Sequence, residues 1–189
     1  ANPSFTCLHI TNPRLTRNEF FDHLSRTLQL SPDASLSKTR FLLEFQKAAA
    51  ERIQQGGHTV LVIDEAQTVS DEVVEELRLL TNIEAEDGGR LLAVVLIGQP
   101  EFAQRLDLPE FRHLKQRVAL RCTLNTLSLQ DTAAFIATRI RAAGGTPASV
   151  FTREAVELVH RASRGIPRVI CVLCDNALIG GFAMNERPV

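Results

Sequence analysis

The sequence predicts a three-layer α/β domain, in which helices cover a parallel β-sheet, followed by a small all-helical subdomain. The first observation is that short apolar, β-branched runs alternate with helical segments up to residue 127. Such alternation is typical of parallel sheets sandwiched between helices. The second observation is that strand signals stop at Ser128, after which only helical segments remain. We therefore expect an α/β core at 1–127 and a helical subdomain at 128–189.

The first third of the chain predicts one strand and two helices. Residues 5–10 (FTCLHI) are few and rich in β-formers, which favours a strand. Thr16 is a suitable N-cap for the next helix, and 37–55 predicts a longer helix that the glycine pair 56–57 ends. The apolar residues of the first helix recur at helical spacing, namely Phe20, Phe21, Leu24, Leu28 and Leu30.

The middle of the chain predicts further strands and helices in alternation. Residues 60–63 and 91–97 are continuously apolar, as in parallel strands that are covered on both faces. Helical periodicity at 73–83 and a helical segment at about 101–117 follow these strands. A last strand is expected near 118–124, which would complete a sheet of four strands.

The tail of the chain predicts helices alone. The segments 129–143, 152–163 and 167–182 have helical character. Glycines at 144–145 and at Gly165 separate them.

The composition gives only weak indications of partners. The chain has 189 residues and a formal net charge of −1, so its charge does not indicate nucleic-acid binding. No apolar run approaches the roughly 20 residues that span a bilayer, and no signal peptide opens the chain. Cys171 and Cys174 form a C-x-x-C inside an apolar helical segment. We interpret them as small buried hydrophobes in a reducing compartment rather than as a metal site.

Two carboxylates follow directly after the apolar run at 60–63. Asp64 and Glu65 would lie at the carboxyl end of a buried parallel strand, the edge where open α/β sheets bind ligands. Nucleotide hydrolysis needs such a pair, with an aspartate to hold Mg²⁺ and a glutamate to orient and deprotonate the attacking water. The alternative is a strand that ends in solvated acids. We favour the catalytic interpretation because a second buried strand also ends in a polar residue, Gln99.

Gln99 itself has two interpretations. If the two strands are neighbours, its side chain would lie beside Asp64, within reach of a γ-phosphate or of the attacking water. Alternatively, Gly98 to Pro100 is only a turn that closes the strand. The sequence leaves both open.

Several motifs in fixed order resemble AAA+ ATPases of the general secretion pathway protein A (ExeA) type. They are Val60–Glu65, Leu96–Glu101, Leu114–Val118 and Gly165–Arg168, with Asn12–Leu15 and Ala177–Phe182 similar as well. The resemblance therefore extends over essentially the whole chain. It implies a P-loop NTPase (AAA+) core with a helical lid, which forms a homo-oligomer and takes ATP and Mg²⁺ as ligands.

The resemblance also implies roles for individual residues. Asp64, as the Mg²⁺ ligand, and Glu65 would form the Walker B motif, and Gln99 would be sensor 1. Arg117 would be the arginine finger and Arg168 would be sensor 2.

The two arginines differ in how well physical arguments support them. Arg168 follows Pro167, which can open a helix and place the guanidinium in its first turn, within reach of a γ-phosphate from the lid. The alternative is a surface arginine. Arg117 could equally be an ordinary surface cation, because several other cations crowd the same region, namely Arg112, Lys115 and Arg121. An arginine finger acts in trans, so that role predicts an oligomer.

The chain departs from the family at the phosphate-binding loop. No G-x-x-x-x-G-K-[ST] occurs in residues 1–189, and no glycine is followed by lysine. We expect either an N-terminally truncated fragment that lacks the first strand and the P-loop, or a protein that has lost nucleotide binding. In both cases we expect this chain alone to bind Mg²⁺ and ATP weakly or not at all, and to be inactive.

Three functions follow. The resemblance implies an ATPase that supports assembly of a bacterial secretion or pilus-type machine, with inner-membrane secretion proteins as partners, at the cytoplasmic face of the inner membrane. The second is a DNA-binding AAA+ ATPase of the transposition-helper or Orc-like type, in which the arginines of 128–189 would contact phosphates. The near-neutral charge argues against nucleic acid without excluding it. The third is a degenerate AAA+ scaffold that binds proteins, against which the joint presence of Asp64, Glu65 and Arg168 argues.

Overall fold

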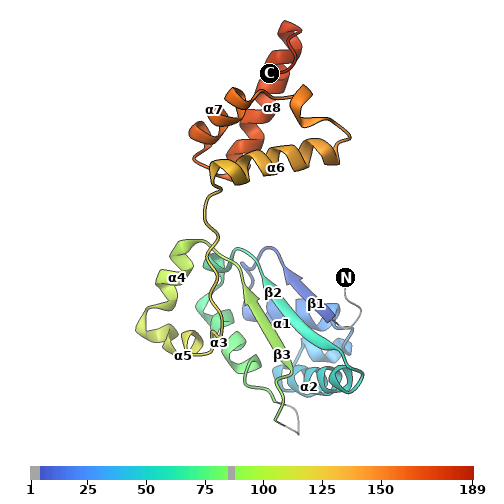
Figure 1. Ribbon diagram of the computed structural model, residues 1–189. Helices are drawn as coiled ribbons and strands as arrows, with labels where there is room; N and C mark the ends of the chain where they lie inside the picture. Colours follow the sequence, from blue (N-terminus) through green and yellow to red (C-terminus); the bar gives the residue numbers. More distant parts are fainter. Residues whose placement is uncertain (1–4, 85–87) are drawn as a thin grey trace. The chain divides into compact units, whose positions relative to one another are not determined.

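The computed structural model describes residues 5–84 and 88–189 and divides into two compact units, 1–120 and 121–189 (Figure 1). The sequence places the domain boundary later, between 127 and 128, and that assignment of domains stays a prediction. The elements of the first unit are β1 (Phe5–Ile10), α1 (Arg17–Thr27), η1 (Pro32–Ser35), α2 (Lys38–Gln54), β2 (His58–Ile63), η2 (Ala66–Thr68), α3 (Asp71–Leu80), β3 (Leu92–Leu96), α4 (Pro100–Leu106), η3 (Pro109–Phe111) and α5 (Arg112–Lys115). The second unit contains α6 (Leu129–Ala142), η4 (Pro147–Ser149), α7 (Arg153–Ser163) and α8 (Pro167–Met184).

The sheet of the first unit has three parallel strands in the order β1-β2-β3. Ile63, the last residue of β2, is in register with Ile10 of β1 and with Leu96 of β3. All three strands therefore end at the same edge, and the segments that follow them start side by side. The helices between the strands are the crossovers that parallel pairing requires.

The prediction of a fourth strand near 118–124 is wrong. These residues form no strand, and Leu120 and Leu124 are 85% and 92% exposed. Alternating apolar residues fit a half-buried strand, but a strand forms only where a neighbouring edge offers hydrogen bonds. Within the described residues the ladder ends at β3, so the segment stays irregular and exposed.

Side-chain caps fix the starts of several helices. Thr16 begins α1 with a capping box, in which its hydroxyl accepts from the backbone of Glu19 and the Glu19 carboxylate accepts from the backbone N–H of Thr16. Ser128 and Asp131 make the same box at the start of α6. Each box satisfies backbone donors that a helix leaves unpaired at its N-terminus.

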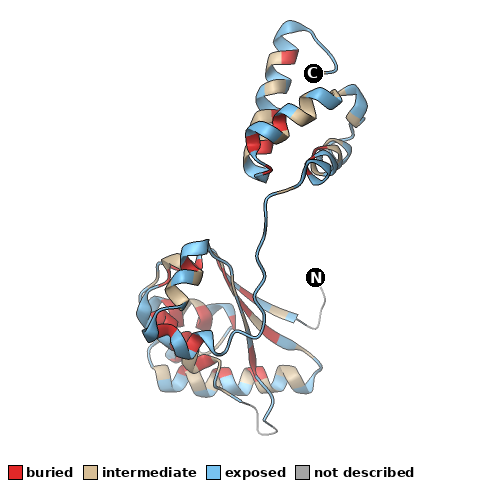
Figure 2. Cartoon of the chain, turned by 60° about the vertical axis from the view of Figure 1, so that its left-hand side comes forward, coloured by how far each residue is buried: buried red, intermediate tan, exposed pale blue. Residues whose placement is uncertain are grey.

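The core of the first unit lies on one face of the sheet (Figure 2). Leu61 and Ile63 of β2 are fully buried there, against a cluster of aromatic rings from the first helices. These rings are Phe20, Phe21, Phe41 and Phe45, which contact one another in succession. On the other face, Val95 and Ile97 are 44% and 47% exposed. The cover expected on both faces of the apolar runs is therefore incomplete at β3.

The second unit is a bundle of three main helices with a small core of its own. Its buried apolar residues are Ile136, Phe151, Val159, Ile170 and Cys174. Thr132 of α6 is fully buried, and its hydroxyl lies 3.0 Å from Nδ1 of His160 on α7. This polar contact joins two helices inside an otherwise apolar interface.

The prediction from the sequence that no apolar segment is long enough to cross a bilayer is wrong at helix α8. This helix has 18 residues and a mean hydropathy of 1.4, enough to span a membrane by length and composition. A mostly buried core helix of a soluble protein passes the same test, but only 11% of this window is buried. The α8 residues Ile170 and Cys174 do pack in the core of the second unit. We therefore treat it as a helix of the bundle.

The C-x-x-C cysteines lie on α8 and agree only in part with the sequence interpretation. Cys174 is buried, whereas Cys171 is half-buried. Burial raises the pKa of the Cys174 thiol to about 11, which keeps it protonated at neutral pH. No group of three His, Cys, Asp or Glu side chains that could hold a metal occurs in the part of the chain that the structure describes.

Candidate active site

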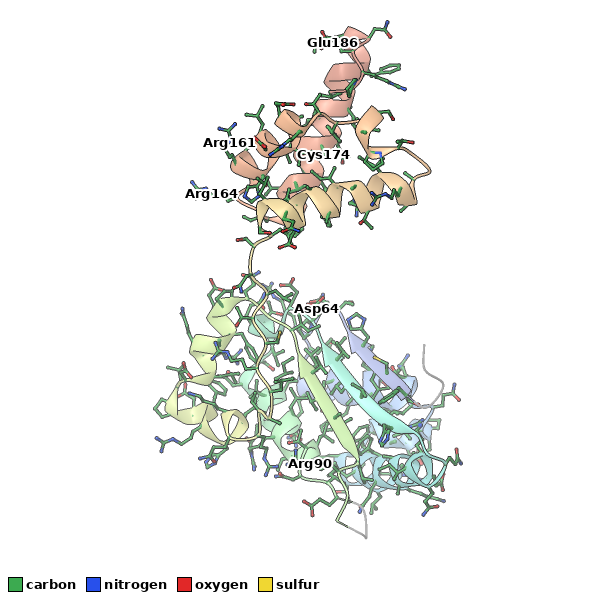
Figure 3. The ribbon with its side chains drawn as sticks, in the orientation of Figure 1. Asp64, Arg90, Arg161, Arg164, Cys174 and Glu186 are labelled. Atoms are coloured by element: carbon green, nitrogen blue, oxygen red, sulfur yellow. The ribbon has the colours of Figure 1, made fainter. Side chains whose placement is uncertain are left out.

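Asp64 and Glu65 leave the carboxyl end of β2 at the sheet edge, as the sequence predicts. The N–H of Asp64 donates to the carbonyl of Ile10 over 2.9 Å, which ties it to the end of β1. Its Oδ1 accepts the N–H of Glu65 over 2.8 Å. Oδ2 of Asp64 has no hydrogen-bond partner among the described residues, so one carboxylate oxygen is available to a ligand. Figure 3 shows Asp64 at this end of the sheet.

The backbone turns sharply at Glu65. Its φ and ψ are 52° and 38°, the left-handed region that non-glycine residues seldom adopt. The turn is held because the carbonyl of Glu65 accepts the N–H of Thr68 over 2.8 Å and its hydroxyl over 2.9 Å. Backbone strain of this kind is found at functional sites, where the surrounding structure must enforce it. Here it leaves the Glu65 side chain exposed at the sheet edge.

Gln99 lies next to the acidic turn because β2 and β3 are neighbours. The N–H of Ile97 donates to the carbonyl of Ile63 over 2.9 Å, and the carbonyl of Ile97 accepts the N–H of Ala66 over 2.8 Å. The chain then passes Gly98 and reaches Gln99, which is the N-cap of α4 with Pro100 at the first helical position. The condition attached to the sensor interpretation, that the two strands pair, is therefore met.

Gln67 is a site residue that the sequence analysis missed. Its Nε2 donates to Oε2 of Glu65 over 2.5 Å, and its Oε1 accepts the backbone N–H of Gln99 over 3.1 Å. The Gln67 amide thus links the Glu65 carboxylate to Gln99 at the start of α4. Its place two residues after Glu65 was the available signal, but only the pairing of β2 with β3 puts Gln99 within its reach.

Arg117 is not brought to the acidic pair of its own chain. Its N–H donates to the carbonyl of Leu114 just after α5, and its side chain is exposed. It lines a cavity of about 410 Å³ with other polar side chains, namely Arg78, Arg90, His113 and Gln116. Arg90 precedes β3, and Figure 3 shows it at the opposite end of the sheet from Asp64. Arg117 therefore lies with Arg90 at the end of its own sheet opposite to Asp64.

Arg168 lies in the second unit, in the first turn of α8 directly after Pro167, as the sequence predicts. Its side chain is exposed. The preceding Gly165 has a φ of +74°, and its carbonyl accepts the N–H of Leu127 over 2.8 Å. A Cβ at this position would lie 2.1 Å from the carbonyl oxygen of Leu127. Glycine is thus required for the turn that presents Arg168.

The donor set at the sheet edge fits Mg²⁺. Asp64 and Glu65 offer carboxylate oxygens, which a small hard cation prefers. Mg²⁺ commonly takes one or two protein carboxylates and completes its octahedron with water and phosphate oxygens. An adjacent pair with one free Asp64 oxygen suits this mode of binding better than a cage made by the protein alone.

Comparison with known proteins gives three findings. A family model described as AAA domain matches residues 1–106. The chain is 38% identical over 181 residues to General secretion pathway protein A of Aeromonas hydrophila, in a match that covers 96% of this chain and 33% of that protein. The chain therefore spans about a third of the length of that curated relative.

The third finding concerns solved structures. The Aeropyrum pernix ORC2 protein in its ADP form matches with a TM-score of 0.66 at 12% identity, covering 98% of this chain and 50% of that chain. The same protein in ADPNP-ADP complexes matches with a TM-score of 0.64 at 13% identity, covering 100% and 50%. At such low identity these matches show the fold alone.

Proposed function

The chain belongs to the AAA domain family, and from that premise we propose that it carries the Walker B part of an ATP-hydrolysing site. It is an AAA-type domain related to general secretion pathway protein A, and its fold resembles that of the ORC2 protein. The observation that supports the proposal best is the meeting of Asp64, Glu65 and Gln99 at one sheet edge. Open α/β sheets bind their ligands there.

Each residue at this edge has a part in hydrolysis. Asp64 holds Mg²⁺, which when bound neutralises charge on the phosphate oxygens. Glu65 accepts a hydrogen bond from the attacking water and takes its proton as the water oxygen bonds to the γ-phosphorus and the bond to the ADP oxygen breaks. Gln99, in the turn after the neighbouring strand, contacts the γ-phosphate or the same water. The products are ADP and phosphate.

Arg117 and Arg168 lie outside the sheet edge that carries Asp64 and Glu65. The role we propose for Arg168 is that of sensor 2, whose guanidinium can bind γ-phosphate oxygens in bidentate fashion. Arg117 faces the opposite edge of its own sheet, so it serves as an arginine finger only for the nucleotide of another copy. This proposed role of Arg117 therefore implies a homo-oligomer.

Residues 1–189 contain no glycine-rich loop with its lysine. Such a loop supplies backbone N–H groups and a positive charge to the phosphates. We therefore expect residues 1–189 alone to bind Mg-ATP weakly or not at all and not to hydrolyse it. Mg-ATP titration by calorimetry into this chain, beside the full-length product of its gene, tests this. Saturable turnover by residues 1–189 alone would refute it.

The same pair of proteins tests the function as a whole. We expect the full-length product to bind Mg-ATP and to hydrolyse it, and the Glu65→Gln variant to bind but not to turn over. If neither protein binds Mg-ATP, the carboxylates have no nucleotide to act on. The scaffold function would then replace the ATPase, and protein partners would be sought instead.

The biological role rests on the curated relative. We propose that the ATPase serves assembly of a secretion or pilus-type machine at the cytoplasmic face of the bacterial inner membrane, because of the 38% identity to general secretion pathway protein A. Co-purification of the full-length protein with inner-membrane secretion components tests this role. Recovery of the protein without any such component would argue against it.

The second candidate function is a DNA-binding ATPase, for which the charge of the second unit is the only argument. All the cations of 128–189 are arginines, which could contact phosphates. Binding of duplex DNA that persists at physiological salt would favour this candidate, and no mobility shift even at low salt would remove it.

A further inference from the structure

We propose that Gln67 is a positioning residue for the proposed general base, holding the Glu65 carboxylate to the backbone N–H of Gln99, the N-cap of α4. The inference rests on the proposed hydrolysis and adds to it the residue that orients Glu65. It begins from the contacts of the Glu65 side chain. That side chain is exposed, and its single hydrogen-bond partner among the described residues is Nε2 of Gln67, at 2.5 Å from Oε2.

Several hydrogen bonds fix the backbone at Glu65, whereas Gln67 is the only residue that holds its side chain in the described part of the chain. The left-handed turn, the bond from Ala66 to the carbonyl of Ile97 and the two bonds from Thr68 hold the main chain in place. An exposed glutamate on a fixed backbone still samples several rotamers. A general base must keep its oxygen within hydrogen-bond reach of the water, so a partner that selects one rotamer matters for the rate.

Gln67 is chemically suited to this link. Its half-buried amide has a donor at one end and an acceptor at the other, so it can donate to a carboxylate while it accepts an N–H. The opposite amide orientation would satisfy neither partner. The amide oxygen would then face the Glu65 carboxylate, where both groups accept, and the amide NH₂ would face the N–H of Gln99, where both donate. An ionised glutamate could only accept, and an apolar side chain of the same length could do neither.

The other end of the link is the turn between β3 and α4. Oε1 of Gln67 accepts the N–H of Gln99 over 3.1 Å. Gly98 leaves room for this contact, since a Cβ at that position would lie 3.1 Å from Oε1 of Gln67 and 3.3 Å from Cβ of Phe102. The position of the Glu65 carboxylate therefore depends on the turn that carries Gln99. A ligand that moves Gln99 would move Glu65 through the same amide.

The experiment replaces Gln67 by methionine, which has similar length but no amide. In the full-length product we expect Gln67→Met to lower the single-turnover hydrolysis rate by roughly 10- to 100-fold. We take this range from the loss of a hydrogen-bond partner that orients a metal-ligating side chain, because Gln67 orients Glu65 in the same way. The dissociation constant for Mg-ATP and the melting temperature should stay unchanged. The control is Gln104→Met on α4, because Gln104 is exposed and its side chain makes no hydrogen bond in the described residues.

A second measurement needs no activity. In the ¹⁵N spectrum of residues 1–189, Gln67→Met should shift the backbone amide of Gln99, and Glu65→Gln should shift the side-chain amide of Gln67, whereas Gln104→Met should move neither. Missing shifts would overturn the inference. Full turnover in Gln67→Met would also overturn it, and a fall in ATP affinity and melting temperature parallel to the rate would reduce Gln67 to a structural role.

The failure of the proposed function would look different. A wild-type full-length protein that binds Mg-ATP but never hydrolyses it, or that does not bind it, refutes the hydrolysis itself. In that case the contact seen in the spectrum would be structural only, and the positioning role would be overturned with the function. Turnover in wild type and in Gln104→Met, with loss in Gln67→Met, supports both.

Discussion

The ion cluster around Glu76 gives the sharpest prediction about the stability of the first unit. The Glu76 side chain on α3 is only 6% exposed and lies 2.6 Å from Nε of Arg17 and 2.6 Å from Nζ of Lys38. Nζ of Lys38 also donates to Oε1 over 2.9 Å, and Oε2 has charge attraction but no well-aligned hydrogen bond. One buried carboxylate thus joins the starts of α1 and α2 to α3.

The expected loss of stability in Glu76→Gln depends on whether Arg17 and Lys38 can reach water once the carboxylate is gone. Removal of one member of a buried pair costs about 3 to 5 kcal/mol when the other charge stays buried. Here Arg17 and Lys38 are 46% and 30% exposed, so both cations can turn partly to water. We therefore expect Glu76→Gln to lower the free energy of unfolding of the first unit by about 2 kcal/mol, a melting shift of roughly 6 to 10 °C.

The assay is urea and thermal unfolding followed by circular dichroism, since the chain has no Trp or Tyr for fluorescence. The matched control is Asp22→Asn, which removes the exposed pair between Asp22 and Arg26 and should change stability by less than about 0.5 kcal/mol. A Glu76→Gln loss no larger than that of the control would refute the reasoning, because burial would then add nothing to the value of the pair.

Three other predictions concern the second unit. Gly165→Ala should destabilise it by more than about 2 kcal/mol, measured by calorimetry, since a Cβ would lie 2.1 Å from the carbonyl oxygen of Leu127 at a φ of +74°; an unchanged transition would contradict the close approach. Ser128→Ala should cost about 1 kcal/mol in urea unfolding through loss of the box with Asp131, and a neutral effect would mean that the cap is solvated anyway. Because burial raises the pKa of Cys174 from 9.0 to about 11, the unfolded state loses its proton first, and the unit should lose stability as pH rises from 9 to 11. Cys174→Ala should flatten that dependence, and an identical slope in the variant would assign it to other groups.

Much of the fold and of the candidate site could be predicted from local signals. The parallel α/β class and the helical tail are confirmed by the structure and by its likeness to ORC2, and the family resemblance is confirmed by the 38% identity to general secretion pathway protein A. Apolar runs, caps and glycine breaks act within a few residues, so periodicity finds them. The roles of Asp64, Glu65, Gln99, Arg117 and Arg168 stay predictions.

The tertiary structure alone decided what depends on pairing between distant segments. Residues 118–124 have the alternation of a strand but stay irregular, because no edge in the described part of the sheet pairs with them. Gln67 reaches Gln99 only because Ile63 and Leu96 are in register on neighbouring strands. Arg117 faces the other end of the sheet from Asp64, which no spacing along the chain could tell. Sequence patterns report the conformation and burial of each segment, whereas strand order and register arise from contacts between segments that lie far apart along the chain.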